Sequence, residues 1–106
     1  MSRLVYADTT RYEPRGARRL SHEEAYWLQF GLQHMEPGPL RSEYLSQIDG
    51  LEVTAACDCG EPTCVTVQFM GGGVQDTTRL VELELRDGRL LLIRHVQGRI
   101  AELEVI

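Results

Sequence analysis

The sequence contains no lysine, so all eleven of its basic residues are arginines. No apolar run reaches the roughly 20 residues that a membrane-spanning helix needs, so we expect no membrane partner. The net charge of −5 argues against a nucleic-acid partner, because phosphate binding depends on clustered cations. Residues 1–20 are rich in arginine and lack the apolar segment of a signal peptide, which favours a cytoplasmic location.

Cysteine is also scarce, with three residues that all lie between positions 57 and 64. An odd number of cysteines cannot be fully paired within one chain, which suits a reducing compartment. A chain of 106 residues is long enough for one domain with its own core and too short for two. The cysteines are therefore not needed as structural cross-links.

Charge divides the chain into a basic arm at residues 1–19 and a single acidic α+β domain at residues 20–106. Residues 1–20 carry five arginines against two acids, whereas residues 21–106 carry six arginines against fourteen acids. We expect that the arm folds back on its own body, stays disordered or recruits an acidic partner.

Two helices are predicted before residue 50. The first begins at Ser21, which forms a capping box with Glu24, and it ends before the prolines of residues 36–39. A second, shorter helix follows over residues 40–48 and ends at Asp49 and Gly50. Each helix has an apolar stripe with a 3.6-residue period. The two inner faces consist of Ala25, Leu28, Leu32 and Met35, and of Leu40, Tyr44, Leu45 and Ile48.

From Leu51 onward the apolar period changes to two, which predicts five antiparallel strands. The pairs Asp87-Gly88 and Gln97-Gly98 are typical of two-residue hairpin turns. We therefore expect a five-stranded antiparallel meander with the two helices packed on one face. The turns predict the cross-strand pairs Leu83–Leu92, Leu92–Leu103 and His95–Ile100.

In this register several apolar side chains point away from the helices, and Leu91, Ile93 and Ile100 form a cluster among them. Apolar residues in the middle of an outer face indicate a second layer, supplied by the arm, by a second copy of the chain or by another protein. We predict an interface at these three residues. The same face carries the acidic residues Glu82, Glu84, Glu102 and Glu104, which would suit the arginines of the arm.

The segment ACDCGEPTCVTV, residues 56–67, contains all three cysteines and permits three interpretations. Cys57, Cys59 and Cys64 are inert core thiols, zinc ligands or a redox pair. Three thiolates are fewer than the four ligands of a closed zinc site, so the fourth ligand would come from a histidine or from a cysteine of a partner chain. The candidate histidines are His22, His34 and His95.

The strand register bears on these interpretations. It predicts that Cys57 lies opposite Val67 and Cys59 opposite Val65, with both thiols facing the core. Cys64 then lies in the turn or points to the opposite face. This arrangement favours inert thiols over a site that uses all three.

The cysteine motif and the last strand together resemble a known pattern. Residues 57–63 read CDCGEPT, and residues 98–105 read GRIAELEV. With a leading helix, this order resembles a family of small uncharacterised bacterial proteins that have a C-x-C-G-x-P-[ST] hairpin and a late GRLxxLEV strand. The resemblance covers residues 20–106 and implies an α+β fold, with no known activity. The chain departs from the pattern at Glu61, where a third close cysteine often lies, and by adding Cys64.

We predict no catalytic residues. The glycines at residues 71–73 lack the lysine and hydroxyl residue of a phosphate-binding loop, and no serine lies in a nucleophile elbow. The resulting prediction is a non-catalytic protein-interaction or self-associating module without a cofactor. The alternative is a small zinc-binding or thiol-redox protein that uses Cys57, Cys59 and Cys64.

Overall fold

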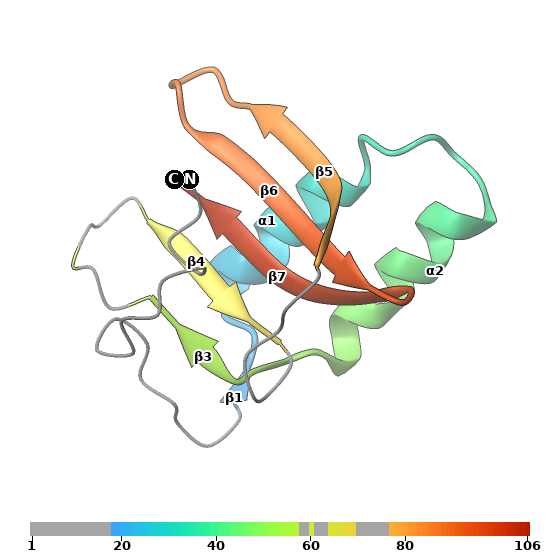
Figure 1. Ribbon diagram of the computed structural model, residues 1–106, viewed down its shortest axis with the longest axis horizontal. Helices are drawn as coiled ribbons and strands as arrows, with labels where there is room; N and C mark the ends of the chain where they lie inside the picture. Colours follow the sequence, from blue (N-terminus) through green and yellow to red (C-terminus); the bar gives the residue numbers. More distant parts are fainter. Residues whose placement is uncertain (1–17, 58–59, 61–63, 70–76) are drawn as a thin grey trace.

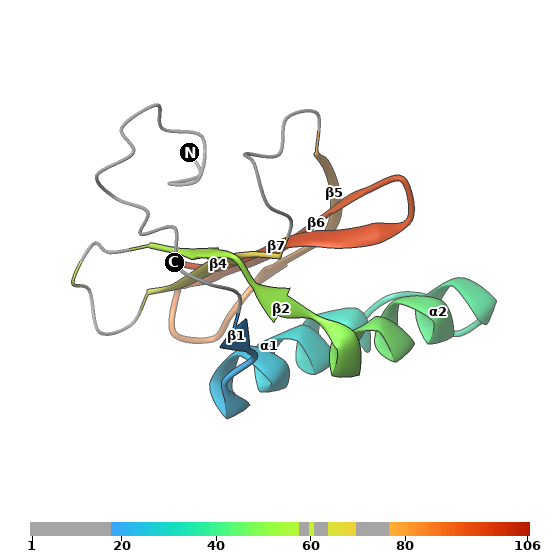
Figure 2. The same cartoon turned by 90° about the horizontal axis from the view of Figure 1, so that it is seen from below.

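The structure is a computed structural model that describes residues 18–57, 60, 64–69 and 77–106. Two helices pack on one face of a five-stranded antiparallel sheet, and a second, two-stranded sheet lies at its edge (Figures 1 and 2). The predicted α+β class is confirmed. Within the described ranges no helix is long and apolar enough to cross a membrane.

The helices are α1 (His22–Leu32) and α2 (Pro39–Gln47), followed by the 3-10 helix η3 (Ile48–Gly50). The strands of the large sheet are β3 (Ala55–Ala56), β4 (Val65–Gln68), β5 (Thr78–Glu84), β6 (Leu90–Val96) and β7 (Arg99–Val105). The small sheet joins β1 (Arg18–Arg19) to β2 (Glu52–Val53). The last two residues of the predicted arm thus pair with the body, and residues 1–17 lie outside the described part of the chain.

Helix α1 begins as predicted. The hydroxyl of Ser21 accepts a hydrogen bond from the Glu24 amide at 3.1 Å, and the Glu24 carboxylate accepts one from the Ser21 amide at 2.9 Å. Arg18 donates to both oxygens of the same carboxylate. Burial alone would raise the pKa of Glu24, but the Arg18 ion pair and the Ser21 hydrogen bonds outweigh it, so this pKa lies below its ordinary value.

Helix α1 lies close to β6. A Cβ atom at Gly31 would lie 2.8 Å from both Ile93 Cδ1 and Leu91 Cδ2, so only glycine permits this approach without a shift of the core. Leu28 and Leu32 are fully buried in the same core.

Helix α2 starts at Pro39 and is tied to the sheet by Tyr44. The Tyr44 hydroxyl lies 2.8 Å from Nδ1 of His95. Leu40, which the sequence placed on the inner face, is 56 % exposed, so that prediction is wrong. Leu40 lies in the first turn of the helix, before the point where α2 reaches the core.

The sheet is not the predicted meander. Its strand order is β3-β4-β7-β6-β5, so β4 pairs with the last strand rather than with β5 (Figure 1). Strands β5 to β7 are connected by hairpins, and β4 lies beside β7, which is Greek-key connectivity. Val65 and Val67 lie opposite Val105 and Leu103, so this pairing joins two apolar surfaces on the helix side of the sheet.

The turn at Asp87 and Gly88 is longer than predicted. The Leu85 amide bonds to the Arg89 carbonyl and the Gly88 amide to the Leu85 carbonyl, with Gly88 at φ +90°. This is the geometry of a three-residue loop with a glycine bulge. Leu83 therefore pairs with Leu91 instead of Leu92, a shift of one residue that reverses the face of every side chain on β6.

The turn at Gln97 and Gly98 is as predicted, because His95 lies opposite Ile100. Both turn residues have positive φ, +48° and +80°, as a type I′ turn requires. A bulge next to His95 then shifts the register, so that Leu103 pairs with Ile93 rather than with Leu92.

These two register shifts overturn the predicted interface. Leu91 and Ile93 are fully buried and Ile100 is 1 % exposed, and all three belong to the core that the helices cover. They are enclosed by the chain itself, so no partner can reach them in the folded protein.

Candidate functional site

The outer surface of α1 carries an aromatic stripe, which we define as Glu23, Tyr26, Trp27, Phe30 and His34. Their spacing places them on one side of the helix, away from the residues that face the sheet. Tyr26 is 55 % exposed, whereas Trp27 and Phe30 are half-buried against the core. The stripe thus combines two rings that pack partly on the core with the exposed ring of Tyr26.

The rings of the aromatic stripe form a continuous series of contacts. Tyr26 stacks on Phe30 with ring centroids 6.1 Å apart, and both rings contact Trp27 edge to face. Phe30 also lies 4.8 Å from the His34 ring. The guanidinium of Arg89 lies 5.3 Å from the centre of the Trp27 ring, within range of a cation–π interaction. The exposed Tyr26 ring thus packs against both Trp27 and Phe30.

This surface was not among the predicted sites, although the sequence contains a signal for it. Tyr26, Phe30 and His34 are spaced four residues apart, which is a helical period offset from the inner stripe. The interface was instead predicted at the larger apolar cluster on the sheet.

A second candidate site lies on the face of the sheet that the helices do not cover (Figure 2). We define the far-face cluster as Thr66, Arg94, Glu102 and Glu104. In β7 these glutamates alternate with Leu103 and Val105, which face the helices. Glu104 lies opposite Thr66, and Glu102 lies opposite Arg94, with Arg94 Nε 3.1 Å from the Glu102 carboxylate.

The two glutamates of the far-face cluster are buried, with exposed fractions of 6 % for Glu102 and 0 % for Glu104. Burial, and then the charge of Glu104, raise the pKa of Glu102 to about 7, although Arg94 acts in the opposite direction. The sequence placed both residues on the outer face, which is where they lie. Glu102 therefore changes its charge near neutral pH.

The described cysteines lie beside the far-face cluster rather than in the core. Ala56, not Cys57, is opposite Val67, and the Cys57 amide donates to the Thr66 carbonyl at 2.9 Å. The prediction that Cys57 faces the core is therefore wrong by one residue. Cys64 lies on the face away from the core, which is one of the two places predicted for it. Its Sγ is 3.2 Å from the Thr66 hydroxyl.

The zinc interpretation stays a prediction, because Cys59 lies outside the described residues. Within the described ranges no three histidine, cysteine or acidic side chains gather as a metal site. Of the proposed fourth ligands, His95 pairs with Tyr44, and His34 has its Nδ1 2.8 Å from the Phe30 carbonyl. His22 is exposed at the start of α1.

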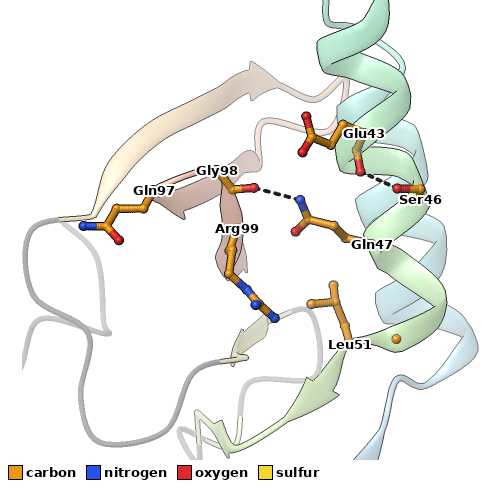
Figure 3. Close-up of a pocket in the computed structure, with 8 residues that line it drawn as sticks. Glu43, Ser46, Gln47, Leu51, Gln97, Gly98 and Arg99 are labelled. Carbon is orange, nitrogen blue, oxygen red and sulfur yellow. Dashed lines mark hydrogen bonds between the residues drawn. The ribbon is translucent and has the colours of Figure 1, made fainter.

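A cleft of about 480 Å³ separates α2 from the β6–β7 turn (Figure 3). Gln47 bridges it, donating to the Gly98 carbonyl at 2.8 Å and accepting from the Ile100 amide at 2.9 Å. Apart from Leu51 its lining is polar or glycine, unlike the mostly apolar and enclosed pockets that bind small molecules. We therefore assign the cleft a structural role, in which Gln47 fixes the hairpin to the helix.

This role predicts the effect of Gln47→Ala. We expect the variant to lose about 1–2 kcal/mol of unfolding free energy, because the Gly98 carbonyl and the Ile100 amide lose their side-chain partner. Urea unfolding followed by circular dichroism measures the change. Ser46→Ala is the control, since the Ser46 hydroxyl donates to the Glu43 carbonyl of its own helix. Equal stability of the two variants would contradict the role of Gln47.

Comparisons with known proteins found no match, either to a family model or to a curated protein or a solved structure. The resemblance to small uncharacterised bacterial proteins therefore stays a prediction.

Proposed function

We propose that the protein is a non-catalytic self-associating module, and that the aromatic stripe of α1 docks against the same stripe of a second copy. The observation that carries the proposal is the exposed Tyr26 ring, held in place by its stack on Phe30. Tyrosine, tryptophan and arginine dominate the energetic centres of protein interfaces, and here Tyr26, Trp27 and Arg89 adjoin one another.

The charges at the two ends of the stripe support a second copy as the partner. Glu23 lies at the amino-terminal end of α1, whereas Arg41 lies at the carboxy-terminal end, where its guanidinium donates to the Gln33 carbonyl at 3.2 Å. In a two-fold dimer with antiparallel α1 helices, Glu23 of each chain approaches Arg41 of the other. The helix dipoles are also antiparallel in this arrangement.

The test is Tyr26→Glu. We expect the wild-type chain to dimerise and the variant to dissociate at least about tenfold more readily, because the interface loses its central ring and gains two facing charges. Sedimentation velocity across a concentration series measures both dissociation constants. The variant should still fold, since position 26 is 55 % exposed and glutamate favours helices.

Leu90→Glu is the matched control, because Leu90 is 37 % exposed and lies on β6 rather than on α1. It should dimerise like the wild type. A wild-type chain that stays monomeric up to about 100 µM would contradict the proposal, since the interface would then be worth less than about 5.5 kcal/mol. Native mass spectrometry of the same samples would detect a bound zinc ion, the outcome expected if Cys57, Cys59 and Cys64 form a metal site instead.

A further inference from the structure

Helix α2 is held against the sheet by a contact between two titratable side chains. The Tyr44 hydroxyl lies 2.8 Å from Nδ1 of His95, and the two rings meet edge to face with their centroids 5.7 Å apart. Tyr44 is 2 % exposed, and His95 is half-buried. The described residues offer the Tyr44 hydroxyl no other hydrogen-bond partner. The contact therefore depends on which of the two atoms carries the proton between them.

The Tyr44 hydroxyl suits the role of donor in this contact. A neutral imidazole with its proton on Nε2 presents Nδ1 as an acceptor, whereas an imidazolium carries a proton on both nitrogens. Burial, and then the charge of Glu43, raise the pKa of Tyr44, so the hydroxyl keeps its own proton through the neutral range. Protonation of His95 therefore places two donors face to face and leaves the buried hydroxyl proton without an acceptor among the described residues.

The charged groups next to His95 do not compensate a charge on its ring. The three strands around this position each carry a neighbouring arginine, namely Arg79 on β5, Arg94 on β6 and Arg99 on β7. The acids Glu82 and Glu102 pair with Arg79 and Arg94. On α2 the acid beside Tyr44 is Glu43, which is exposed and therefore screened by water. A positive charge on His95 thus gains little from these neighbours.

We propose that Tyr44 and His95 form a proton-sensitive latch, which holds α2 on the β6–β7 hairpin at neutral pH and releases it when His95 is protonated. Imidazole is the side chain whose charge ordinarily changes between pH 5 and pH 8. Gln47 lies about one turn after Tyr44 on the same helix, and its bonds to Gly98 and Ile100 span the cleft of about 480 Å³ (Figure 3). Because both contacts belong to one helix, release at Tyr44 also loosens the Gln47 bridge and widens the cleft.

Hydrogen exchange of the Ile100 amide, followed by NMR on the full chain, tests the latch directly. This amide donates to the Gln47 side chain, so the bond breaks when α2 leaves the sheet. We expect its protection factor, corrected for the intrinsic pH dependence of exchange, to fall at least about tenfold between pH 7.5 and pH 5. The Leu103 amide in the centre of the sheet reports global unfolding and should lose no protection over the same range.

Tyr44→Phe removes the hydroxyl and keeps the ring, so Ile100 protection in this variant should vary with pH by less than about twofold. His34→Gln is the control, because His34 bonds to the Phe30 carbonyl of its own helix, and it should keep the pH dependence of the wild type. Equal pH dependence in the wild type and Tyr44→Phe would overturn the proposal, as would wild-type protection that does not change with pH. Loss of the dependence in His34→Gln would overturn it too, because the proton would then act at another histidine.

A second variant keeps the test valid if Tyr44→Phe does not fold. In His95→Asn the amide oxygen can accept from the Tyr44 hydroxyl in place of Nδ1, and an amide does not titrate. We expect this variant to protect the Ile100 amide equally at pH 5 and pH 7.5, and a tenfold loss at pH 5 would show that His95 is not the sensor. Nitrogen-15 NMR of the wild-type His95 ring at pH 7.5 identifies its tautomer. A proton on Nδ1 would also overturn the proposal, because the hydroxyl would then already be the acceptor.

Discussion

Ile93→Lys is expected to abolish folding. Ile93 is fully buried, and its Cδ1 atom lies 2.8 Å from the position that a Cβ at Gly31 would take, so a lysine side chain has no route to solvent. Burying an ammonium group without a partner costs several kcal/mol, which is comparable with the whole stability of about 5–15 kcal/mol of a small domain. We expect no cooperative thermal transition by circular dichroism and collapsed amide dispersion by NMR.

Leu90→Lys is the matched control for this substitution. Leu90 begins the same strand and is 37 % exposed, so its variant should fold and lose less than about 1 kcal/mol. A folded Ile93→Lys with a melting temperature near that of the wild type would show that Ile93 lies on an outer face. That result would restore the register predicted from a two-residue turn at Asp87 and Gly88.

Glu102→Gln is expected to stabilise the protein at pH 8 by about 2 kcal/mol and to leave it nearly unchanged at pH 5. The pKa of Glu102 is raised to about 7 in the folded protein, against 4.5 ordinarily. Between these two values the folded state binds more protons than the unfolded state, so the free energy of unfolding falls as pH rises. The full shift corresponds to about 3.4 kcal/mol, and partial solvent screening reduces it.

Thermal or urea unfolding of both proteins between pH 5 and pH 8 measures this difference. The groups facing Glu102 are Arg94 on β6, Gln68 on β4 and Glu104 on its own strand. Taking the difference between wild type and variant cancels other titrations, such as that of Glu24, whose lowered pKa makes stability fall at acidic pH.

Glu82→Gln, at a 45 % exposed position, should follow the wild type at every pH. A constant offset between wild type and Glu102→Gln would mean that Glu102 stays ionised throughout.

The elements that could be predicted were those specified by neighbours in the sequence. The capping box of Ser21 and Glu24 acts over three residues, and the type I′ turn at Gln97 and Gly98 needs only positive φ at two positions. The α+β class also followed from the change of apolar period at Leu51. In each case the interaction that fixes the structure is local.

The candidate sites were less accessible to prediction because they depend on register. The glycine bulge at Gly88 and the bulge beside His95 each shift the pairing by one residue. Each shift exchanges the two faces of the strands beyond it, which moved Leu91 and Ile93 from the predicted interface into the core. The aromatic stripe, in contrast, lies on a single helix, and its four-residue spacing was visible in the sequence.

By itself, then, the sequence determined the class of fold, the start of α1, the β6–β7 turn and the face on which Glu102 and Glu104 lie. Only the tertiary structure decided that β4 pairs with β7, which residues of β6 face the helices, and that the two glutamates are buried. The physical reason is that strand pairing and burial depend on contacts between distant segments, and a difference of one residue in a turn is enough to change them.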